Sequence, residues 1–526
     1  MSEASSLIVE RLWRLKRGVD NGDCQGLAFV HLNNLLRDPV YRDEVLEQVA
    51  RQGTDELRAL AREIQAMDQG EPLLARSPQP VQHTQRTTAT SKRHPWRRRA
   101  LWLLPAMGTA LAISVGFTAF ENRAERIDSD ITSVTTWESG RTYILDDIVF
   151  VRNTRLTIQP GARVEGTNGA ALVVLPDSQL YSRGQAGNPV VFTSHKAEGL
   201  RSRGDWGGVV LLGNAPVNQP NASIEGLHAG TRAGQFGGSD ADSSCGVVEY
   251  TRIEFAGYEV SKDNELNGLT LGGCGRNTII RNVQVHRALD DGIEMFGGTV
   301  DLKKVLITGA GDDGIDWDWG WNGRVQFAVI QQHPDAGDNA FEGDNNGDSH
   351  QATPRSEPTF YNVTLAGSGQ GATQHRGMVL REGTGGHFHN MIIDSYGIGA
   401  LDTRDEVSAL VGNDRLTFTN NLIANTGRIG VRKQERGDRD DDFGFDEQAW
   451  IKTPSSDNFF EIGSALQPAA RNVRHPAFES SIPMRQMTAT TPPQSEFFEE
   501  SATFQGALNP LTRDSWIEGW TAFPVN

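Results

Sequence analysis

Residues 281–346 read RNVQVHRALDDGIEMFGGTVDLKKVLITGAGDDGIDWDWGWNGRVQFAVIQQHPDAGDNAFEGDNN, and they contain one short motif three times. The copies are Asp291-Gly-Ile-Glu294, Asp313-Gly-Ile-Asp316 and Asn339-Ala-Phe-Glu342. The starts of the copies are 22 and 26 residues apart, and a short apolar run precedes each one. Repeats of this length, with β-branched runs and Gly/Asp corners, are typical of solenoids. We therefore predict an all-β fold of stacked coils.

Composition limits the classes of protein to which the chain can belong. With 526 residues it is too long for one compact core, so two or more units are expected. Its formal net charge of −17 argues against nucleic acid as a partner, because an acidic surface repels phosphate. Two of its three cysteines, Cys245 and Cys274, fall in the repeat region. They could form one disulfide in an oxidising compartment or stay two separate buried thiols.

The first part of the chain differs from the repeats. Residues 1–70 place apolar side chains three and four apart, which predicts a small α-helical unit, and a cytoplasmic protein is its expected partner. Residues 71–99 are a linker rich in Pro, Gln, Thr and Ser that ends in the basic cluster KRHPWRRR. The unit contains nothing that suggests catalysis.

Residues 100–120, ALWLLPAMGTALAISVGFTAF, form a run without charge that is long enough to cross the bilayer. The basic cluster precedes this run, so the positive-inside rule predicts a cytoplasmic N-terminus and an extracytoplasmic chain from residue 121. A cleaved signal peptide is the competing interpretation, but the run starts late and lacks an A-x-A site. We predict a single-pass anchor in the lipid bilayer of the bacterial inner membrane, with residues 121–526 in the periplasm. Polar inserts are expected near 333–358 and 431–475.

Several segments carry a resemblance to a known family. They include LTIQPGARVEG, GNPVVFTS, RSRGDWGGVVLLGNAPVN, the DDGIEMFGGTV…DDG coils and the C-terminal SWIEGWT. Together they cover most of residues 142–345 and about the last 25 residues. This pattern resembles a group of secreted or envelope bacterial right-handed parallel β-helix proteins, which are mostly uncharacterised and lipoprotein-like. The resemblance implies a right-handed parallel β-helix and no particular activity.

Alternation along each strand assigns the repeated side chains to two faces. If Ile293 and Met295 point into the coil, Glu294 points out of it. The same phase puts Ile315, Trp317 and Phe341 inside and predicts an outer column of Glu294, Asp316 and Glu342, with Asp318 and Asp344 alongside. Stacked carboxylates repel one another unless a cation or proton intervenes, and dense oxygen ligands suit Ca²⁺. These five acids are therefore the predicted Ca²⁺ ligands.

Two kinds of catalysis would use this column. Carboxylates one and two coils apart, among Glu294, Asp316 and Glu342, have separations that bracket those of glycoside hydrolases. In a polysaccharide lyase, Ca²⁺ would acidify a uronate while Arg376 or Arg381 removed its proton, with His375, His387 and His389 in reserve. The corner motifs Asp290-Asp291-Gly and Asp312-Asp313-Gly have a purely structural interpretation, in which their carboxylates accept backbone N–H groups.

The sequence thus predicts a membrane-anchored β-helix that binds a glycan or envelope polymer along its acidic face, with Ca²⁺ as the candidate cofactor. A carbohydrate-active enzyme, either lyase or glycoside hydrolase, is the first alternative. A mainly structural envelope protein is the second.

Overall fold

The computed structural model divides the chain into two compact units, Met1–Trp102 and Leu103–Asn526. It describes residues 39–67 and several residues between 8 and 35 in the first unit. In the second unit it describes residues 124–526, except for the gaps at 225, 228–233, 262–263, 370–374, 431–442, 483–487 and 513–514.

The described part of the first unit is helical, as predicted. Its helices include α3 (Pro39–Gln52) and α4 (Asp55–Met67). Apolar residues spaced three and four apart, such as Leu46, Val49, Leu57 and Ile64, are buried in a core of their own. The predicted linker and anchor, 71–99 and 100–120, lie outside the described residues. Among the helices that the structure does describe, none is long and apolar enough to cross a membrane.

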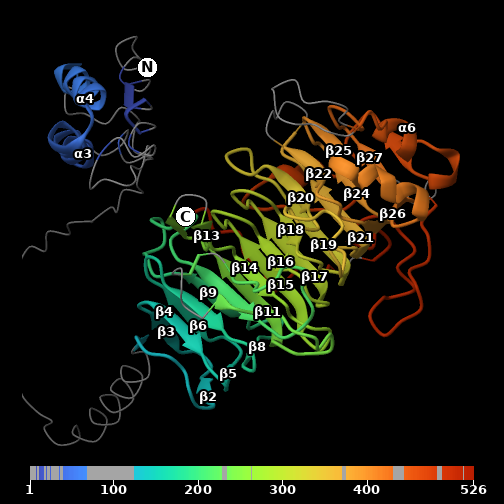
Figure 1. Cartoon of the computed structure of the whole chain (residues 1–526), viewed down its shortest axis with the longest axis horizontal. Helices are drawn as coiled ribbons and strands as arrows, with labels where there is room; N and C mark the ends of the chain where they lie inside the picture. Colours follow the sequence, from blue (N-terminus) through green and yellow to red (C-terminus); the bar gives the residue numbers. More distant parts are fainter. Residues whose placement is uncertain are drawn as a thin grey trace, which may run out of the picture. The chain divides into compact units, whose positions relative to one another are not determined.

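The second unit is a parallel β-helix, as its repeats predict (Figure 1). One side is a nine-stranded sheet in which every neighbouring pair is parallel. Its strands are β4 (Ile148–Val151), β7 (Ala171–Val174), β10 (Gly208–Leu212), β14 (Leu269–Gly272), β16 (Ile293–Phe296), β18 (Ile315–Asp318), β20 (Asn339–Gly343), β22 (Arg376–Leu380) and β25 (Gly399–Thr403).

A seventeen-stranded sheet forms the rest of the coil wall. In the first coils it consists of short strands: β1 (Glu125–Ile127), β2 (Thr135–Trp137), β3 (Thr142–Leu145), β5 (Arg155–Ile158), β6 (Arg163–Gly166), β8 (Gln179–Arg183) and β9 (Val190–Ser194). Longer strands follow: β11 (Gly246–Glu254), β15 (Ile279–His286), β17 (Asp301–Thr308), β19 (Arg324–Gln331) and β21 (Thr359–Ala366). The last coils use β23 (Gly386–His389), β24 (Ile392–Asp394), β26 (Leu416–Thr419), β27 (Leu422–Ala424) and β28 (Phe459–Glu461).

Smaller elements decorate the coils. They are the β12–β13 hairpin (Glu259–Ser261 and Asn264–Glu265), helix α6 (Glu447–Ile451), and the 3₁₀ turns Asp405–Asn413, Pro454–Ser456 and Pro468–Arg471. Within the predicted insert 431–475, β28 pairs with β27 and so adds one more rung.

Each long strand bends once, at a residue with positive φ. Strand β11 pairs with β8 before Tyr250 and with β9 after it, so the bend joins two sheets into one. The residues at this position in successive rungs have φ between 44° and 62°: Tyr250, Asn282, Lys304, Phe327, Asn362, Asn390 and Asn420. Asparagine is the non-glycine residue that tolerates this conformation best, and four of the seven positions hold it.

Asn362 combines this conformation with two hydrogen bonds, from its Nδ2 to the carbonyls of Ala502 and Phe504 at 3.0 and 2.6 Å. We expect Asn362→Ala to lower the free energy of unfolding by about 2–3 kcal/mol, because it loses these two bonds and the one that Oδ1 accepts from Gln326 at 3.2 Å, and because its φ is strained. Asn362→Gly loses the same bonds but tolerates the φ, so it should recover about 1 kcal/mol. Chemical denaturation of both variants measures this, and equal losses would exclude backbone strain as a contributor.

The interior of the coil confirms the predicted phase. Ile293, Met295, Ile315, Trp317 and Phe341 are all buried in the central core. Aromatic rings continue this core along the axis, because Phe360 lies 5.4 Å from Trp317, 4.8 Å from Phe341 and 5.2 Å from Phe388 between ring centroids. Trp321 is also buried, whereas Trp319 lies outside the coil against Phe296.

Candidate functional site

The predicted acidic column exists on the outer face of the nine-stranded sheet. Glu294 pairs in register with Asp316, and Asp316 with Glu342, on the adjacent strands β16, β18 and β20. Oxygens of Asp291, Glu294 and Asp316 lie within 4.8 Å of one another. Oxygens of Asp313, Asp316 and Glu342 do the same, so Asp316 belongs to both groups. The fold thus concentrates negative charge around Asp316.

These acids are less accessible than an outer face suggests. Glu294 is 7% exposed and Asp344 is 6% exposed, while Asp316, Asp318 and Glu342 are half-buried. Asn267 donates a hydrogen bond to Oε2 of Glu294. The Oδ1 atom of Asp316 is buried and has no hydrogen-bond partner within the described ranges. The column therefore has an unsatisfied acceptor at its centre.

The corner residues Asp291 and Asp313 have the purely structural role considered above, in which their carboxylates accept backbone N–H groups. Oδ1 of Asn267 accepts the N–H of Asp291 at 3.3 Å, and Oδ1 of Asp291 accepts that of Asp313 at 2.8 Å. Oδ1 of Asp313 then accepts the N–H of Asn339 at 2.5 Å. Each corner side chain thus ties its coil to the next. The glycine that follows also has a steric role, since a Cβ on Gly292 would lie 2.5 Å from the Gly314 carbonyl oxygen.

Burial and mutual repulsion raise the pKa values of these carboxyl groups. Burial is the main cause for Asp316, whose pKa is raised well above its usual range, and the charges of Glu294 and Glu342 add to it. Burial raises the pKa of Glu342 to about 7, although the nearby Arg381 opposes the shift. Burial raises the pKa of Asp318 to about 8, against the hydrogen bond from the Trp319 N–H. Part of the column therefore holds protons at neutral pH when no cation is bound.

The guanidinium of Arg381 contacts the acids at one end of the column. Nη2 of Arg381 lies 2.5 Å from Oε1 of Glu342 and 2.9 Å from Oδ2 of Asp344. Burial opposes the charge of Arg381, but the two carboxylates outweigh it and hold the guanidinium pKa above its usual range. That shift is the opposite of what a general base needs. Arg376 lies further along, 3.3 Å from both Asp338 and Asp402.

The histidines do not join this site. His387 and His389 lie on β23 of the other sheet, where their Nδ1 atoms contact Oγ1 of Thr417 and Thr419 at 2.9 and 2.7 Å. His375 is buried and contacts Ser368 Oγ and the Ala336 carbonyl.

Two features of the column were not recognised in the sequence. Asn267-Gly-Leu-Thr270 is an earlier copy of the corner motif, 24 residues before Asp291, and it supplies the amide that contacts Glu294. Asp402 continues the column beyond Glu342, with Val379 between them in register. The 24-residue spacing of Asn267-Gly-Leu-Thr270 could have identified it as a copy of the motif. Asp402 could not be found in this way, because no Asp-Gly corner precedes it.

Because acids with raised pKa favour the protonated folded state, we expect the metal-free protein to become less stable as pH rises. For Asp318 the window runs from its ordinary value of 3.8 to about 8, since the folded state binds the proton more tightly throughout it. Melting temperature in EDTA should therefore fall between pH 6 and 8.5. Asp318→Asn keeps an acceptor for the Trp319 N–H but cannot titrate, so it should flatten this slope. An unchanged slope would contradict the assignment.

The insert between β10 and β11 covers the lower rungs beside the column. A disulfide joins Cys245 at its end to Cys274. Its apolar residues Ala222, Ile224 and Phe236 pack on the outer side chains of β7 and β10. Further up, Asn218 donates to the carbonyl and Oδ1 of Asn345, both at 3.0 Å. The insert therefore runs beside the column as far as Asn345, the residue after Asp344.

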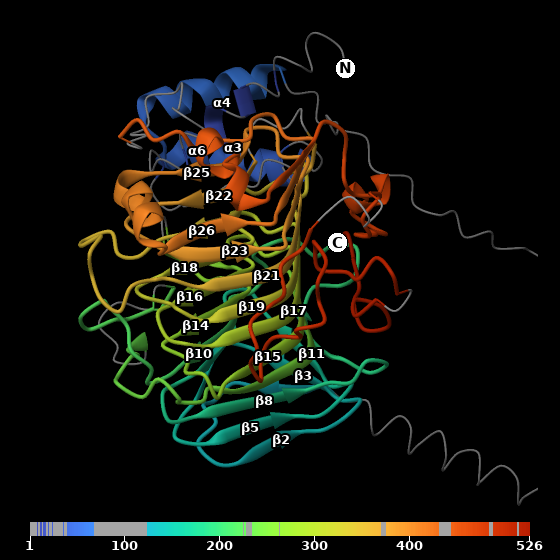
Figure 2. The same ribbon diagram turned by 90° about the vertical axis from the view of Figure 1, so that its right-hand side faces the viewer.

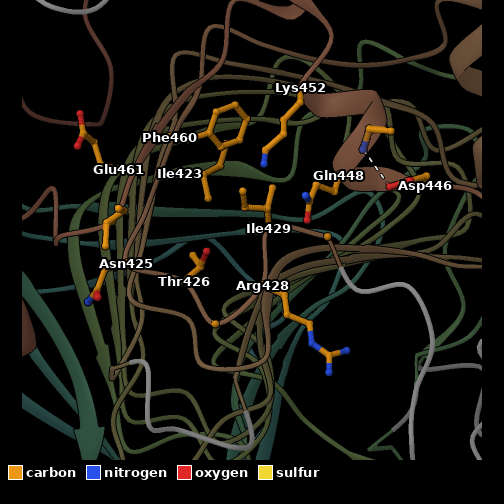
Figure 3. Close-up of a pocket in the computed structure, with 14 residues that line it drawn as sticks. Ile423, Asn425, Thr426, Arg428, Ile429, Asp446, Gln448, Lys452, Phe460 and Glu461 are labelled. Atoms are coloured by element: carbon orange, nitrogen blue, oxygen red, sulfur yellow. Dashed lines mark hydrogen bonds between the residues drawn. The ribbon is translucent and has the colours of Figure 1, made fainter.

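A separate pocket of about 840 Å³ lies near β27 and β28. Its walls combine Ile423, Ile429 and Phe460 with the polar groups of Gln448 and Lys452, whose amine lies between Phe460 and Gln448 (Figure 3). None of the predicted site residues lines it. This pocket therefore lies apart from the acidic column.

Comparison with known families gives one match. Residues 129–521 match the model of the pectate-lyase-like β-helix domain. Searches of curated proteins and of solved structures gave no match. The match covers most of the chain and supports the predicted right-handed β-helix family. The chain therefore belongs to the family of the pectate-lyase-like β-helix domain.

Proposed function

We propose that the β-helix binds a polysaccharide or other envelope polymer along the acidic column, and that Ca²⁺ assists this binding. The observation that carries the proposal is the double set of close carboxylate oxygens around Asp316, whose buried Oδ1 has no partner among the described residues. Ca²⁺ takes six to eight oxygens at 2.3–2.6 Å, so two or three carboxylates leave positions for oxygens of a ligand. The chemistry of the donors fits this ion.

The residues assigned to Ca²⁺ are Glu294, Asp316, Asp318, Glu342 and Asp344. Asp316 is the central one, because it belongs to both groups of oxygens. Asp344 is the weakest of the five candidate ligands, because Arg381 already neutralises part of its charge. A cation at Asp316 would relieve the repulsion that, in addition to burial, raises these pKa values.

A linear polymer suits this surface for geometric reasons. The column extends across successive rungs, which lie about 4.8 Å apart. A glycan lying along the axis would meet an equivalent position at each rung. Arg381 offers a guanidinium to an acidic sugar at the end of the column, with Arg376 beyond it. The family of the β-helix domain supports a carbohydrate-related role.

A carbohydrate-active enzyme is the second candidate, and one observation favours it. With a pKa of about 7, Glu342 can hold a proton at neutral pH, as the general acid of a glycoside hydrolase must. Glu294 and Asp316 would then be the candidate nucleophile or base. A lyase that used Arg381 or Arg376 as its base would need a guanidinium to lose its proton beside two carboxylates, which makes the glycoside hydrolase the better supported of the two enzymes.

The proposed setting is the bacterial inner membrane, crossed once by residues 100–120, with the β-helix in the periplasm. The basic cluster before this run and the disulfide in the β-helix support this topology. The helical unit would then bind a cytoplasmic protein. A reporter fused after residue 126 tests the topology, and a cytoplasmic signal there would overturn it. A structural envelope protein is the remaining alternative; it would bind no polymer.

We expect saturating Ca²⁺ to raise the melting temperature of the full chain in detergent, and EDTA to reverse the rise. At 100 times the Kd the stabilisation is about 2.7 kcal/mol. Asp316→Asn should abolish most of it, because it removes a charge from both groups of oxygens. Asp348→Asn, which changes an exposed acid away from the column, is the matched control. A chain that responds equally to Ca²⁺ in both variants would exclude this site.

The polymer is tested separately. A glycan array probed with and without Ca²⁺ should show binding to acidic polysaccharides that Asp316→Asn loses. Release of oligosaccharides from a bound polymer, lost in Glu342→Gln, would establish the enzyme instead. Binding without product release would establish the binding module.

A further inference from the structure

The last residues of the chain lie along the outside of the seventeen-stranded sheet. We use the name tail for residues 488–526, of which 513 and 514 are outside the described set. The tail begins beside the last coils, where the Nδ2 of Asn420 donates to the Thr488 carbonyl at 3.0 Å. It ends beside the early coils, where the Gly199 N–H donates to the Asn526 carbonyl at 3.0 Å. Figure 2 shows this red segment passing over the strands.

Three side-chain amides bind the tail by the same two-point contact. Gln284 donates to the carbonyl of Ala522 at 2.7 Å and accepts its N–H at 3.0 Å. Asn390 does the same with Thr490, at 2.7 and 2.9 Å. Gln326 contacts Glu499 in the same way, at 3.3 and 2.8 Å. These amides read the main chain of the tail, one residue each.

Further contacts also go to main-chain carbonyls of the tail. His286 contacts the Pro524 carbonyl at 2.7 Å through Nε2, and Arg252 donates to the Trp520 carbonyl at 3.3 Å. Apolar side chains of the tail add fixed points, since Ile517 is buried and the Trp520 ring lies 5.9 Å from that of Tyr250. The outer side chains beneath include the buried Leu306 and Val329.

This is how a groove recognises an extended polypeptide. A primary amide carries both a donor and an acceptor, so it can satisfy the N–H and C=O of one ligand residue together. Main-chain contacts of this kind provide affinity, and a few side-chain positions provide specificity. Without the tail, the amides would lose their partners and the apolar side chains beneath would be exposed.

We infer that this face is a peptide-binding groove, which residues 515–526 fill within their own chain and which the same residues of a second copy can fill between chains. The occupant is identified by the contacts above, because this segment already satisfies the groove. A tail on its own chain has an effective concentration in the millimolar range, so exchange is disfavoured until one groove is empty. The inference is independent of the acidic column, which lies on the other sheet.

A complementation experiment tests this. The acceptor is a chain that ends at Thr512, whose groove is open at Gln284. The donor is the full chain with Gln284→Ala, whose own groove holds its tail less well. We expect each alone to be monomeric, and their mixture to form a one-to-one heterodimer in analytical ultracentrifugation. The donor shortened to Thr512 is the control and should form none. A mixture that stays monomeric, while both variants keep the circular dichroism of a β-helix, would overturn the inference.

A peptide experiment covers the case in which the shortened chain does not fold. The fluorescent peptide SWIEGWTAFPVN, residues 515–526, is added to the full wild-type chain, and cleavage of the chain's own tail by a protease is followed. The peptide should accelerate cleavage by displacing the tail. Methylation of the Ala522 nitrogen removes the donor to Gln284 and should reduce the effect at least tenfold. Methylation at Val525, whose N–H has no partner in the described part, is the control. Equal effects of the two peptides, or none from the parent, would overturn the inference.

Discussion

Trp317→Ala should lower the free energy of unfolding by about 3–5 kcal/mol, the range found when a large buried aromatic side chain is removed. The indole is fully buried at the centre of the aromatic core, with Phe341, Phe360 and Phe388 around it. Its Nε1 also donates to Oγ1 of Thr384 at 3.0 Å, so the substitution leaves a buried hydroxyl with one partner fewer. The loss combines a cavity with a broken hydrogen bond.

Trp317→Phe separates these two effects. It keeps most of the ring volume and loses the hydrogen bond, so a loss of about 1–2 kcal/mol is expected. Trp319→Ala is the matched control, because Trp319 has the same side chain two residues later but lies outside the coil. Chemical denaturation followed by tryptophan-independent far-ultraviolet circular dichroism measures all three. Equal losses from Trp317→Ala and Trp319→Ala would contradict the assignment of Trp317 to the core.

The coil and its phase could be predicted because they depend on local periodicity. A side chain in a strand has only two faces to choose from, so one correct assignment, such as Ile293 inside, fixes its neighbours Glu294 and Met295. The equal form of the repeats then gives the register between coils. This is why Glu294, Asp316 and Glu342 could be placed in one column without any knowledge of the loops.

The surroundings of that column could not be predicted in the same way. Burial of Glu294 depends on Asn267, and the wall beside the acids depends on a contact between Asn218 and Asn345, which are 127 residues apart. Contacts between inserts have no periodicity. The contacts under the tail could not be predicted for the same reason, because Gln284 and Ala522 are 238 residues apart. Gln284 also binds main-chain atoms of Ala522, and such atoms are the same in every residue, so they leave no signal in the sequence.

The repulsion that the sequence predicts along the column can be relieved by protons as well as by a cation. An exposed column of five carboxylates would be fully charged at neutral pH and would need a cation at all times. Burial instead raises the pKa values of Glu342 and Asp318 to about 7 and 8, so bound protons also reduce the repulsion between these carboxylates. Binding of the proposed cation would then release protons, and its affinity should rise with pH.

Arg381→Ala is expected to have a second large effect, which depends on pH. The substitution removes the guanidinium that contacts both Glu342 and Asp344, and leaves two largely buried carboxylates without this cation. Breaking a buried ion pair by removing one partner costs about 3–5 kcal/mol. The full cost should appear at pH 8.5, where Glu342 would otherwise be charged. At pH 5.5, below its pKa of about 7, protonation should remove much of the cost.

Ca²⁺ gives this prediction its second arm, because a divalent ion can replace the lost positive charge. At pH 8.5, Ca²⁺ should raise the melting temperature of the Arg381→Ala variant by more than it raises that of the wild type. Arg381→Lys keeps one charge but cannot contact two carboxylates through a planar fork, so it should fall between the two. A loss of stability that is the same at pH 5.5 and 8.5 and unchanged by Ca²⁺ would mean that Arg381 acts by packing alone. Then the column would have no electrostatic role in holding the coil together, and the cation proposed for Asp316 would lose its physical basis.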